Sequence, residues 1–125
     1  MIRAAEWDRC AHWIEAALEH SGGSHLIEDV RHLCETDLDY RFLPGKRAAA
    51  VVQVIEYPRL KRLHLWLNGG DMAELVDVLL PIAEAWGRDQ GCTQVTTAGR
   101  TGWDRVMARY GFTPAARICM KELTS

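Results

Sequence analysis

Residues 62–112 read RLHLWLNGGDMAELVDVLLPIAEAWGRDQGCTQVTTAGRTGWDRVMARYGF, and this stretch decides the fold. Three leucines alternate with polar or aromatic residues over Arg62–Leu67, the period-2 pattern of a strand with one buried face. A helix is predicted over Asp71–Gln90, because a capping-box pattern is followed by apolar residues at helical spacing. Cys92–Thr97 is rich in β-branched residues and predicts a second strand, and another helix is expected from Thr101 onward. The stretch therefore predicts a βαβ unit followed by one more helix.

The flanking segments extend this unit at both ends. Two amphipathic helices are predicted over Ala4–His20 and Ser24–Glu35, and two strands over Tyr40–Leu43 and Arg47–Tyr57. Ala115–Leu123 alternates again and predicts a final strand. The expected order is ααβββαβαβ: an α/β domain with a mixed sheet of about five strands flanked by helices. The first three strands are antiparallel, the fourth is added in parallel, and the last is antiparallel to its neighbour.

Composition limits the classes of protein that fit. A chain of 125 residues with 48% hydrophobic and 26% charged residues suits one globular domain over residues 1–125. The net charge of −2 argues against nucleic acid and anionic membranes as partners, since both require a concentrated positive field. The chain has neither a signal-peptide core nor a membrane-length apolar run, so a cytoplasmic protein is expected.

The four cysteines favour free thiols in a reducing compartment, since they lie far apart with no C-x-x-C pair. No metal site is expected. The pairs Cys10-x-His12 and His32-x-Cys34 fall in predicted helices, where residues two apart point about 200° away from each other.

The element order resembles the GNAT superfamily of N-acyltransferases over essentially the whole chain. Local support comes from the strand-to-helix step at Leu67–Glu74, the turn at Gly91-Cys92, and Gly111-Phe112 after the last helix. The stretch Gly99–Arg105, with Gly-Arg-x-Gly-Trp at its start, also resembles a signature of small GNAT-fold proteins encoded by bacteriophages and prophages. This resemblance implies a protein of the bacterial host cytoplasm, with association with the virion left open.

The resemblance implies acetyl-CoA binding by a loop of the type Arg/Gln-x-x-Gly-x-Gly/Ala, at the place where this chain has Asn68, Gly69, Gly70 and Asp71. The basic residue of that pattern is absent, and Asp71 puts a carboxylate on the backbone donors that a pyrophosphate needs. Two interpretations stay open: an altered cofactor loop, or a strand end followed by a helix cap.

Candidate catalytic residues are few. The family's tyrosine general acid corresponds here to Met107, while Tyr110 lies beside the glycine. His64 is a candidate base, because histidine titrates near neutrality, and a packing histidine is the alternative. Glu56 and Tyr57, at the end of a predicted strand, are further candidates for a base and a hydroxyl.

A partner or ligand surface is expected at Arg100, Trp103 and Trp66. The chain has five tryptophans, and whether Trp7, Trp66 and Trp103 belong to the core or to an interface stays open. Trp103 as an anchor of its helix on the sheet is the alternative.

Two hypotheses of function follow. In the first, acyl-CoA chemistry is weak or lost, no cofactor is bound, and the domain binds proteins, such as other phage proteins in virion assembly. In the second, it is an active acetyl-CoA-dependent N-acetyltransferase acting on a small-molecule or protein amine. Whether the chain is an enzyme, and whether it forms a homo-oligomer, stays open at this point.

Overall fold

The computed structural model describes residues 2–99 and 102–124, and it reproduces the predicted element order except at the end. The elements in chain order are α1 (Ala4–Leu18), α2 (Ile27–Thr36), β1 (Tyr40–Pro44), β2 (Ala48–Glu56), β3 (Lys61–Gly70), α3 (Met72–Glu74), the π-helical turn η1 (Leu75–Leu79), α4 (Leu80–Asp89), β4 (Cys92–Thr97), α5 (Trp103–Met107) and the 3-10 turn η2 (Ala108–Tyr110). The segments α3, η1 and α4 follow one another without a break and form the predicted crossover helix. Within the described ranges, no helix has the length and apolar character needed to cross a bilayer.

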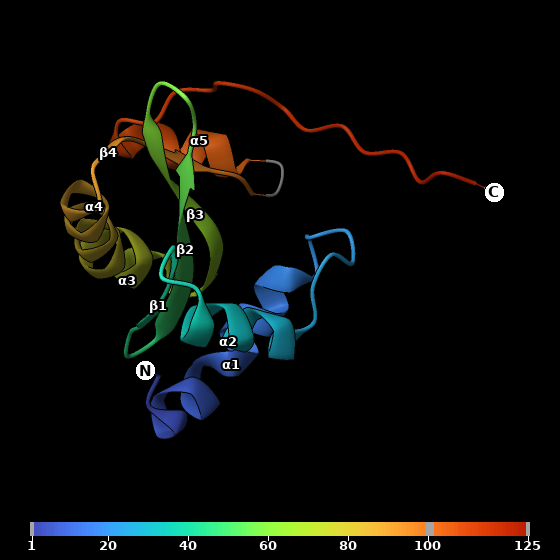
Figure 1. Ribbon diagram of the computed structural model, residues 1–125, viewed down its shortest axis with the longest axis vertical. Helices are drawn as coiled ribbons and strands as arrows, with labels where there is room; N and C mark the ends of the chain where they lie inside the picture. Colours follow the sequence, from blue (N-terminus) through green and yellow to red (C-terminus); the bar gives the residue numbers. More distant parts are fainter. Residues whose placement is uncertain (1, 100–101, 125) are drawn as a thin grey trace.

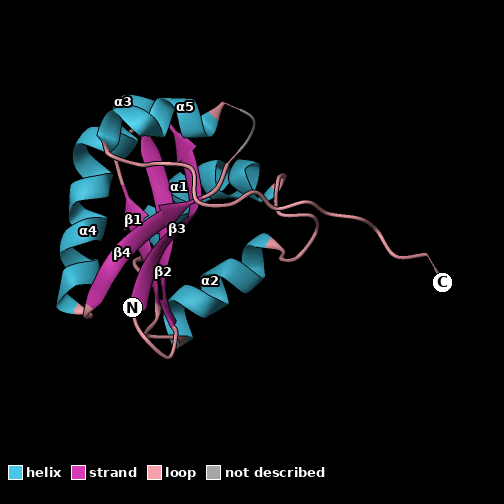
Figure 2. Cartoon of the chain, turned by 90° about the horizontal axis from the view of Figure 1, so that it is seen from above, coloured by secondary structure: helices cyan, strands magenta, loops and turns pink. Residues whose placement is uncertain are grey.

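The strands form one mixed sheet in the order β1-β2-β3-β4. β1 and β3 pair with β2 antiparallel, and β4 pairs with β3 in parallel, as the crossover helix requires. Helices cover both faces: Figure 2 shows α1 and α2 on one side of the sheet and α4 on the other, with α3 and α5 beside it. The α/β sandwich of the prediction is confirmed.

The core has two parts, one on each face of the sheet. On the face of the crossover helix, Leu63 and Leu65 of β3 pack with residues of η1 and α4. On the opposite face, Trp7, Cys10 and Ile14 of α1 pack with β2 and with Leu67. β2 contributes to both parts, as the continuous apolar run of its sequence predicts.

A β-bulge at Trp66 separates these two sets of β3 residues. Val51 pairs with Leu67 and Val52 pairs with Leu65, so Trp66 has no opposite residue on β2. The alternation of three leucines predicts one shared face for all of them. This prediction is wrong for Leu67, because the extra residue turns the strand and sends Leu67 to the face of α1.

The predicted final strand over Ala115–Leu123 does not form, and the sheet has four strands instead of about five. The end of this segment projects from the body of the protein, as both views show (Figures 1 and 2), while the side chain of Met120 lies close to Gly22 in the connection between α1 and α2. Its large apolar side chains are almost fully accessible, with Ile118 89% exposed and Leu123 90% exposed. The pattern is that of a strand, but the fold offers it no hydrogen-bonded neighbour within the chain.

Candidate functional site

The residues of the predicted loop, Asn68–Asp71, are engaged in contacts with other parts of the chain that the sequence does not predict. Gly69 and Gly70 belong to β3, where they pair with Ala49 and Ala48 of β2. Asp71 caps the following helix: its Oδ2 accepts the N–H of Glu74 at 3.1 Å. The cap therefore occupies a backbone donor of the first helical turn, at the place where the helix dipole favours an anion.

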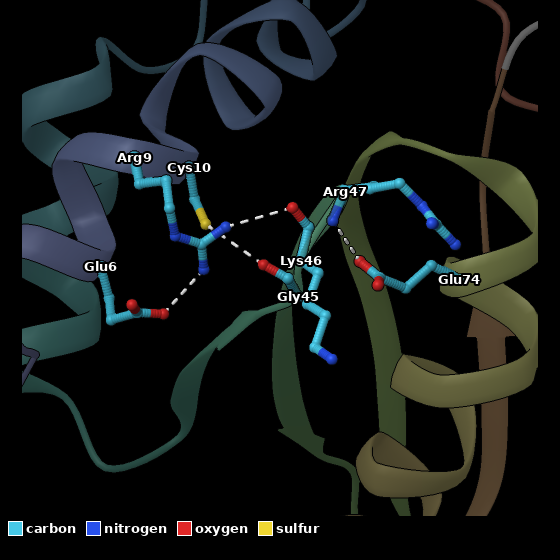
Figure 3. Close-up of polar contacts among 7 residues, drawn as sticks. All are labelled: Glu6, Arg9, Cys10, Gly45, Lys46, Arg47 and Glu74. Carbon is cyan, nitrogen blue, oxygen red and sulfur yellow. Dashed lines mark hydrogen bonds and ion pairs between the residues drawn. The ribbon is translucent and has the colours of Figure 1, made fainter.

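Glu74 completes the cap in a way that the local sequence does not reveal. A capping box requires its side chain to reach back to the N–H of Asp71, but that N–H donates to the carbonyl of Arg47 at 2.9 Å. Glu74 is 7% exposed, and its Oε1 accepts the N–H of Arg47 at 2.7 Å. Figure 3 shows this carboxylate directed at the turn that joins β1 to β2.

The same turn is held from the other side by α1 (Figure 3). Arg9 donates from Nη1 to the carbonyl of Lys46 at 3.3 Å and forms an ion pair with Glu6 at 2.7 Å. The thiol of Cys10 lies 4.0 Å from the carbonyl oxygen of Gly45, and burial raises the pKa of this thiol. The β1–β2 turn thus connects α1 to the start of the crossover helix.

The two glycines of the loop are required by close packing. A Cβ at Gly69 would lie 2.2 Å from the carbonyl oxygen of Trp13 in α1. A Cβ at Gly70, where φ is +99°, would lie 2.5 Å from the carbonyl oxygen of Arg47. Their bare backbones therefore face other parts of the chain, which accounts for both glycines without a ligand.

Among the described residues, the space beside Asn68 is narrow. The space between Leu65, Asn68, Trp103 and Met107 and the crossover helix measures about 20 Å³, room for about one water molecule. Asn68 turns back and donates from Nδ2 to the carbonyl of Leu65 at 3.2 Å. A space of this size between the described residues is far smaller than a nucleotide.

Arg47 supplies a positive charge beside the loop, although the loop sequence contains none. Its side chain is 75% exposed, and its Nε lies 3.9 Å from Oδ2 of Asp71. An exposed pair at this distance contributes little to stability. The structure nevertheless brings the guanidinium of Arg47 beside the first turn of the crossover helix.

His64 lies on β3 on the face opposite Leu63 and Leu65. Its Nδ1 is 2.9 Å from the hydroxyl oxygen of Thr96 on the parallel strand β4. Burial, and to a lesser extent the charge of Arg62, holds the pKa of His64 below its ordinary value, so the ring is neutral at pH 7. In the tautomer whose Nδ1–H donates to this hydroxyl, Nε2 is free to accept a proton.

Glu56 and Tyr57 lie at the opposite end of the β2–β3 hairpin from the loop. Glu56 pairs with Lys61, nine residues before Gly70, so about 30 Å of strand separates the two ends. The hydroxyl of Tyr57 lies 3.4 Å from Nη1 of Arg62, whose guanidinium also covers the tyrosine ring. The structure therefore does not bring these two residues together with Asn68–Asp71.

The three tryptophans left open by the sequence occupy different environments. Trp7 is 4% exposed and packs edge-on against Phe42, which places it in the core. Trp66 is half-buried, with the rings of His25 and Tyr40 edge-on beside it. Trp103 donates from Nε1 to the hydroxyl oxygen of Thr97 at 3.0 Å, and so joins α5 to the end of β4.

Arg100 and Thr101 lie outside the described residues. The residue before α5 is Gly102, with φ of +95°. Residues of the site that sequence reasoning missed are Arg47 and the hydroxyl partner Thr96. Neither has a local signal, because Arg47 lies 27 residues from Glu74 and Thr96 lies 32 residues from His64.

No protein-family model and no curated protein matches the chain. Solved structures match it over nearly its full length. An aminoglycoside N-acetyltransferase in complex with CoA is 9% identical with a TM-score of 0.73, covering 99% of this chain and 92% of that chain. A transcriptional regulator from Bacillus halodurans C-125 is 12% identical with a TM-score of 0.71, and the match covers 98% of this chain and 96% of that chain.

A GNAT family acetyltransferase from Staphylococcus aureus subsp. aureus USA300_TCH1516 is 10% identical with a TM-score of 0.62, covering 98% of this chain and 95% of that chain. Likeness at such low identity concerns the backbone and carries no residue roles, since one fold hosts many functions. The element order, the parallel addition of β4 and these full-length matches agree, and the chain has the GNAT fold.

Proposed function

We propose that this GNAT-fold domain is a protein-binding module that does not use acetyl-CoA. The observation that carries the proposal is the closed state of the β3–α3 loop. The carboxylate of Asp71 occupies the N–H of Glu74, at the end of the helix where the pyrophosphate of CoA would have to bind. An incoming phosphate would meet both repulsion and competition for the donor.

Binding of a protein partner is supported by apolar side chains that the fold leaves accessible. Val78 and Ile82, one helical turn apart along the crossover helix, are 48% and 49% exposed. Ile118, Met120 and Leu123 of the C-terminal segment are exposed to a greater extent. Participation in the assembly of phage particles, which the Gly-Arg-x-Gly-Trp resemblance implies, is the more specific form of this proposal.

The second candidate function is N-acetylation of a small-molecule or protein amine. Arg47 favours it, because its guanidinium stands beside the loop and could hold a phosphate if Asp71 were displaced. The neutral His64 could accept the proton of an amine. The fold neighbours include an acetyltransferase in complex with CoA, which makes this cofactor the one to test.

One calorimetric experiment separates the two functions. The protein is titrated with CoA and with acetyl-CoA up to millimolar concentrations, together with the variants Asp71→Asn and Arg47→Ala. We expect no saturable binding to the wild type and no gain in Asp71→Asn, which should lose less than about 1 kcal/mol of stability because asparagine caps a helix about as well as aspartate.

Micromolar binding by the wild type would overturn the proposal. Tighter binding in Asp71→Asn, lost again when Arg47→Ala is added, would assign the pyrophosphate to this loop. Amine substrates would then be the next subject of study.

A further inference from the structure

We propose that two copies of the chain associate through the outward faces of their crossover helices, which pack antiparallel about a two-fold axis near Ile82. The contact is isologous: an apolar stripe meets the same stripe of the other copy, and the charge at each end of the stripe meets the opposite charge. This inference rests on the proposed protein-binding function and names its partner, a second copy of this chain, for Val78 and Ile82.

The crossover helix carries apolar side chains on two faces. The inward face, with Leu75, Leu79 and Ala83, belongs to the core on that side of the sheet. A second apolar stripe lies on the outward face, where every member is exposed: Val78, Pro81, Ile82 and Ala85. Its spacing of i, i+3, i+4 and i+7 is that of a helix face that packs against another element. Surface helices normally carry polar residues on the face away from the core, so the outward stripe has the character of a helix contact.

The stripe is accessible to a second molecule. Val78 is 48% exposed and Ile82 is 49% exposed, although both side chains are large and apolar. Figures 1 and 2 both show α4 as the outermost element on its side of the sheet, with no described segment beyond it. Neighbouring apolar side chains that a fold leaves uncovered often mark the place where a partner binds.

Pro81 lies in the centre of the stripe, at a position where a helix alone disfavours it. Proline inside a helix removes a backbone donor and crowds the carbonyl of the residue four positions earlier, at a cost of about 3 kcal/mol. The turn before it is π-helical, and in this turn the N–H of Leu80 donates to the carbonyl of Leu75. On the outward face proline provides a rigid apolar surface that loses almost no side-chain entropy when it is covered. Such a surface is useful in a helix contact, whereas an isolated helix gains nothing from it.

Opposite charges stand at the two ends of the stripe. Asp77 precedes the stripe and Arg88 follows it, and both residues are exposed. Among the described residues, neither of them belongs to an ion pair within the chain. They lie eleven residues apart, which is close to three helical turns and about 16 Å, so both project from the same side of the helix.

This arrangement of charges selects one orientation of the two helices. In an antiparallel pair, Asp77 of each copy lies opposite Arg88 of the other, and the two-fold axis produces this contact twice. The midpoint between the two charges falls within about one residue of the midpoint of the apolar stripe, so one axis aligns both. A parallel pair would place like charges together, which disfavours that orientation.

The expected dimer is weak, because each copy contributes one helix. A standard interface buries about 800 Å² per partner, and a single pair of helices buries less. We therefore expect a dissociation constant of about 10 to 100 μM.

The first test measures the molecular mass of the full chain by sedimentation and light scattering, from about 5 μM to about 1 mM, a range that brackets the expected constant. We expect the mass to rise from the 14.1 kDa of one chain toward twice that value. Ile82→Asp should raise the dissociation constant by about thirtyfold or more, since it places a charge in the centre of the apolar contact. The matched control Leu38→Asp adds the same charge at a side chain that is 93% exposed between α2 and β1, and it should leave the constant unchanged.

Ile82 and Leu38 both lie outside the buried core, so the two variants should keep the circular dichroism and thermal unfolding of the monomeric wild type. A wild type that stays monomeric up to about 1 mM would overturn the proposal. A dimer of unchanged affinity in Ile82→Asp would overturn it as well, because the contact would then lie elsewhere.

The second test exchanges the charges at the ends of the stripe. Asp77→Arg alone and Arg88→Asp alone each create two pairs of like charges in the dimer, and each should weaken association by about tenfold. An equimolar mixture of the two variants should form a heterodimer in which opposite charges meet again, with an affinity within about threefold of the wild type. A residue with only a structural role in its own helix would not be rescued by mixing, so the absence of rescue would overturn the antiparallel contact.

The outcome is separable from that of the CoA titration. A monomer that binds no CoA would overturn self-association and would leave the proposed protein-binding function with a different partner. A dimer that binds acetyl-CoA at micromolar concentrations would support the helix contact and would overturn only the proposed lack of cofactor use.

Discussion

The protein divides at the end of the crossover helix into two regions that differ in how completely they are packed. Residues 2–91 contain twenty of the twenty-one buried apolar residues, and both faces of β2 are covered. In residues 92–124 Met107 is the one buried apolar residue among those described, and β4 is half-buried at most. The first region is complete within one chain, while the second has an open edge and an uncovered apolar segment.

This difference indicates that residues 2–91 supply most of the stability of the fold, and that residues 92–124 carry apolar surface that is available to a partner. The turn between β1 and β2 is held from both sides by side chains of α1 and of the crossover helix (Figure 3). Among the described residues 113–124, no side-chain hydrogen bond of this kind is present, and Met120 lies close to Gly22. Exposed apolar side chains that lie together on a surface often mark an interface.

The largest expected difference between the regions is that between two isoleucines. Ile14, on the side of α1 that packs against the sheet, is fully buried, and Ile118 is 89% exposed. Ile14→Ala should lower the free energy of unfolding by about 3 kcal/mol through lost burial and a new cavity. Ile118→Ala should change that free energy by less than about 0.5 kcal/mol in the monomer.

Urea unfolding followed by tryptophan fluorescence measures both values at a concentration where the chain is monomeric. Equal losses in the two variants would contradict the division into a complete region and an incomplete one.

A smaller difference is expected between two polar contacts. Glu74→Leu removes the acceptor of the Arg47 N–H and should cost about 2 kcal/mol, while Glu74→Gln keeps an acceptor oxygen and should cost about half as much. In the other region, Gln94→Ala removes an exposed contact with Arg62 and should cost less than about 0.5 kcal/mol. Thermal unfolding of the three variants gives the order, and a Gln94→Ala loss as large as that of Glu74→Leu would break the comparison.

The fold could be predicted from the sequence wherever a pattern is local. The alternation in β3, the helical spacing after Asp71 and the β-branched run of β4 each needed only neighbouring residues, and each element formed. The final strand over Ala115–Leu123 does not form: alternation shows that a segment can pair, but it does not place that segment beside a neighbouring strand.

The candidate site was less predictable because its contacts span long distances in the sequence. The cap by Asp71 was visible locally, whereas Glu74 was expected to bond within its own turn and instead bonds to Arg47. The bulge at Trp66 likewise has no local signal, and it alone decides which core receives Leu67. Site roles for His64, Asn68 and Trp103 stay predictions until ligand binding is measured.

The smallest expected effect is a pH dependence of stability at the contact between the two regions, where His64 of β3 forms a hydrogen bond with Thr96 of β4. The folded protein holds the pKa of His64 below its ordinary value of 6.5, chiefly through burial and secondarily through Arg62. Above 6.5 the ring is neutral in both folded and unfolded chains, so its contribution to stability is fully present there. As pH falls from 6.5 toward the lower folded pKa, the unfolded chain binds the proton more readily and stability is lost.

The urea midpoint of the wild type should therefore fall more steeply between about pH 7 and pH 5 than that of His64→Gln, by an amount equivalent to less than about 1 kcal/mol. His12→Gln, at an exposed position of α1, serves as the matched control for removing a histidine. If His64→Gln and His12→Gln show the same dependence of the urea midpoint on pH as the wild type, protonation of His64 does not affect the stability of the folded protein. If only His64→Gln flattens the slope, the burial of His64 between β3 and β4 accounts for this part of the pH dependence.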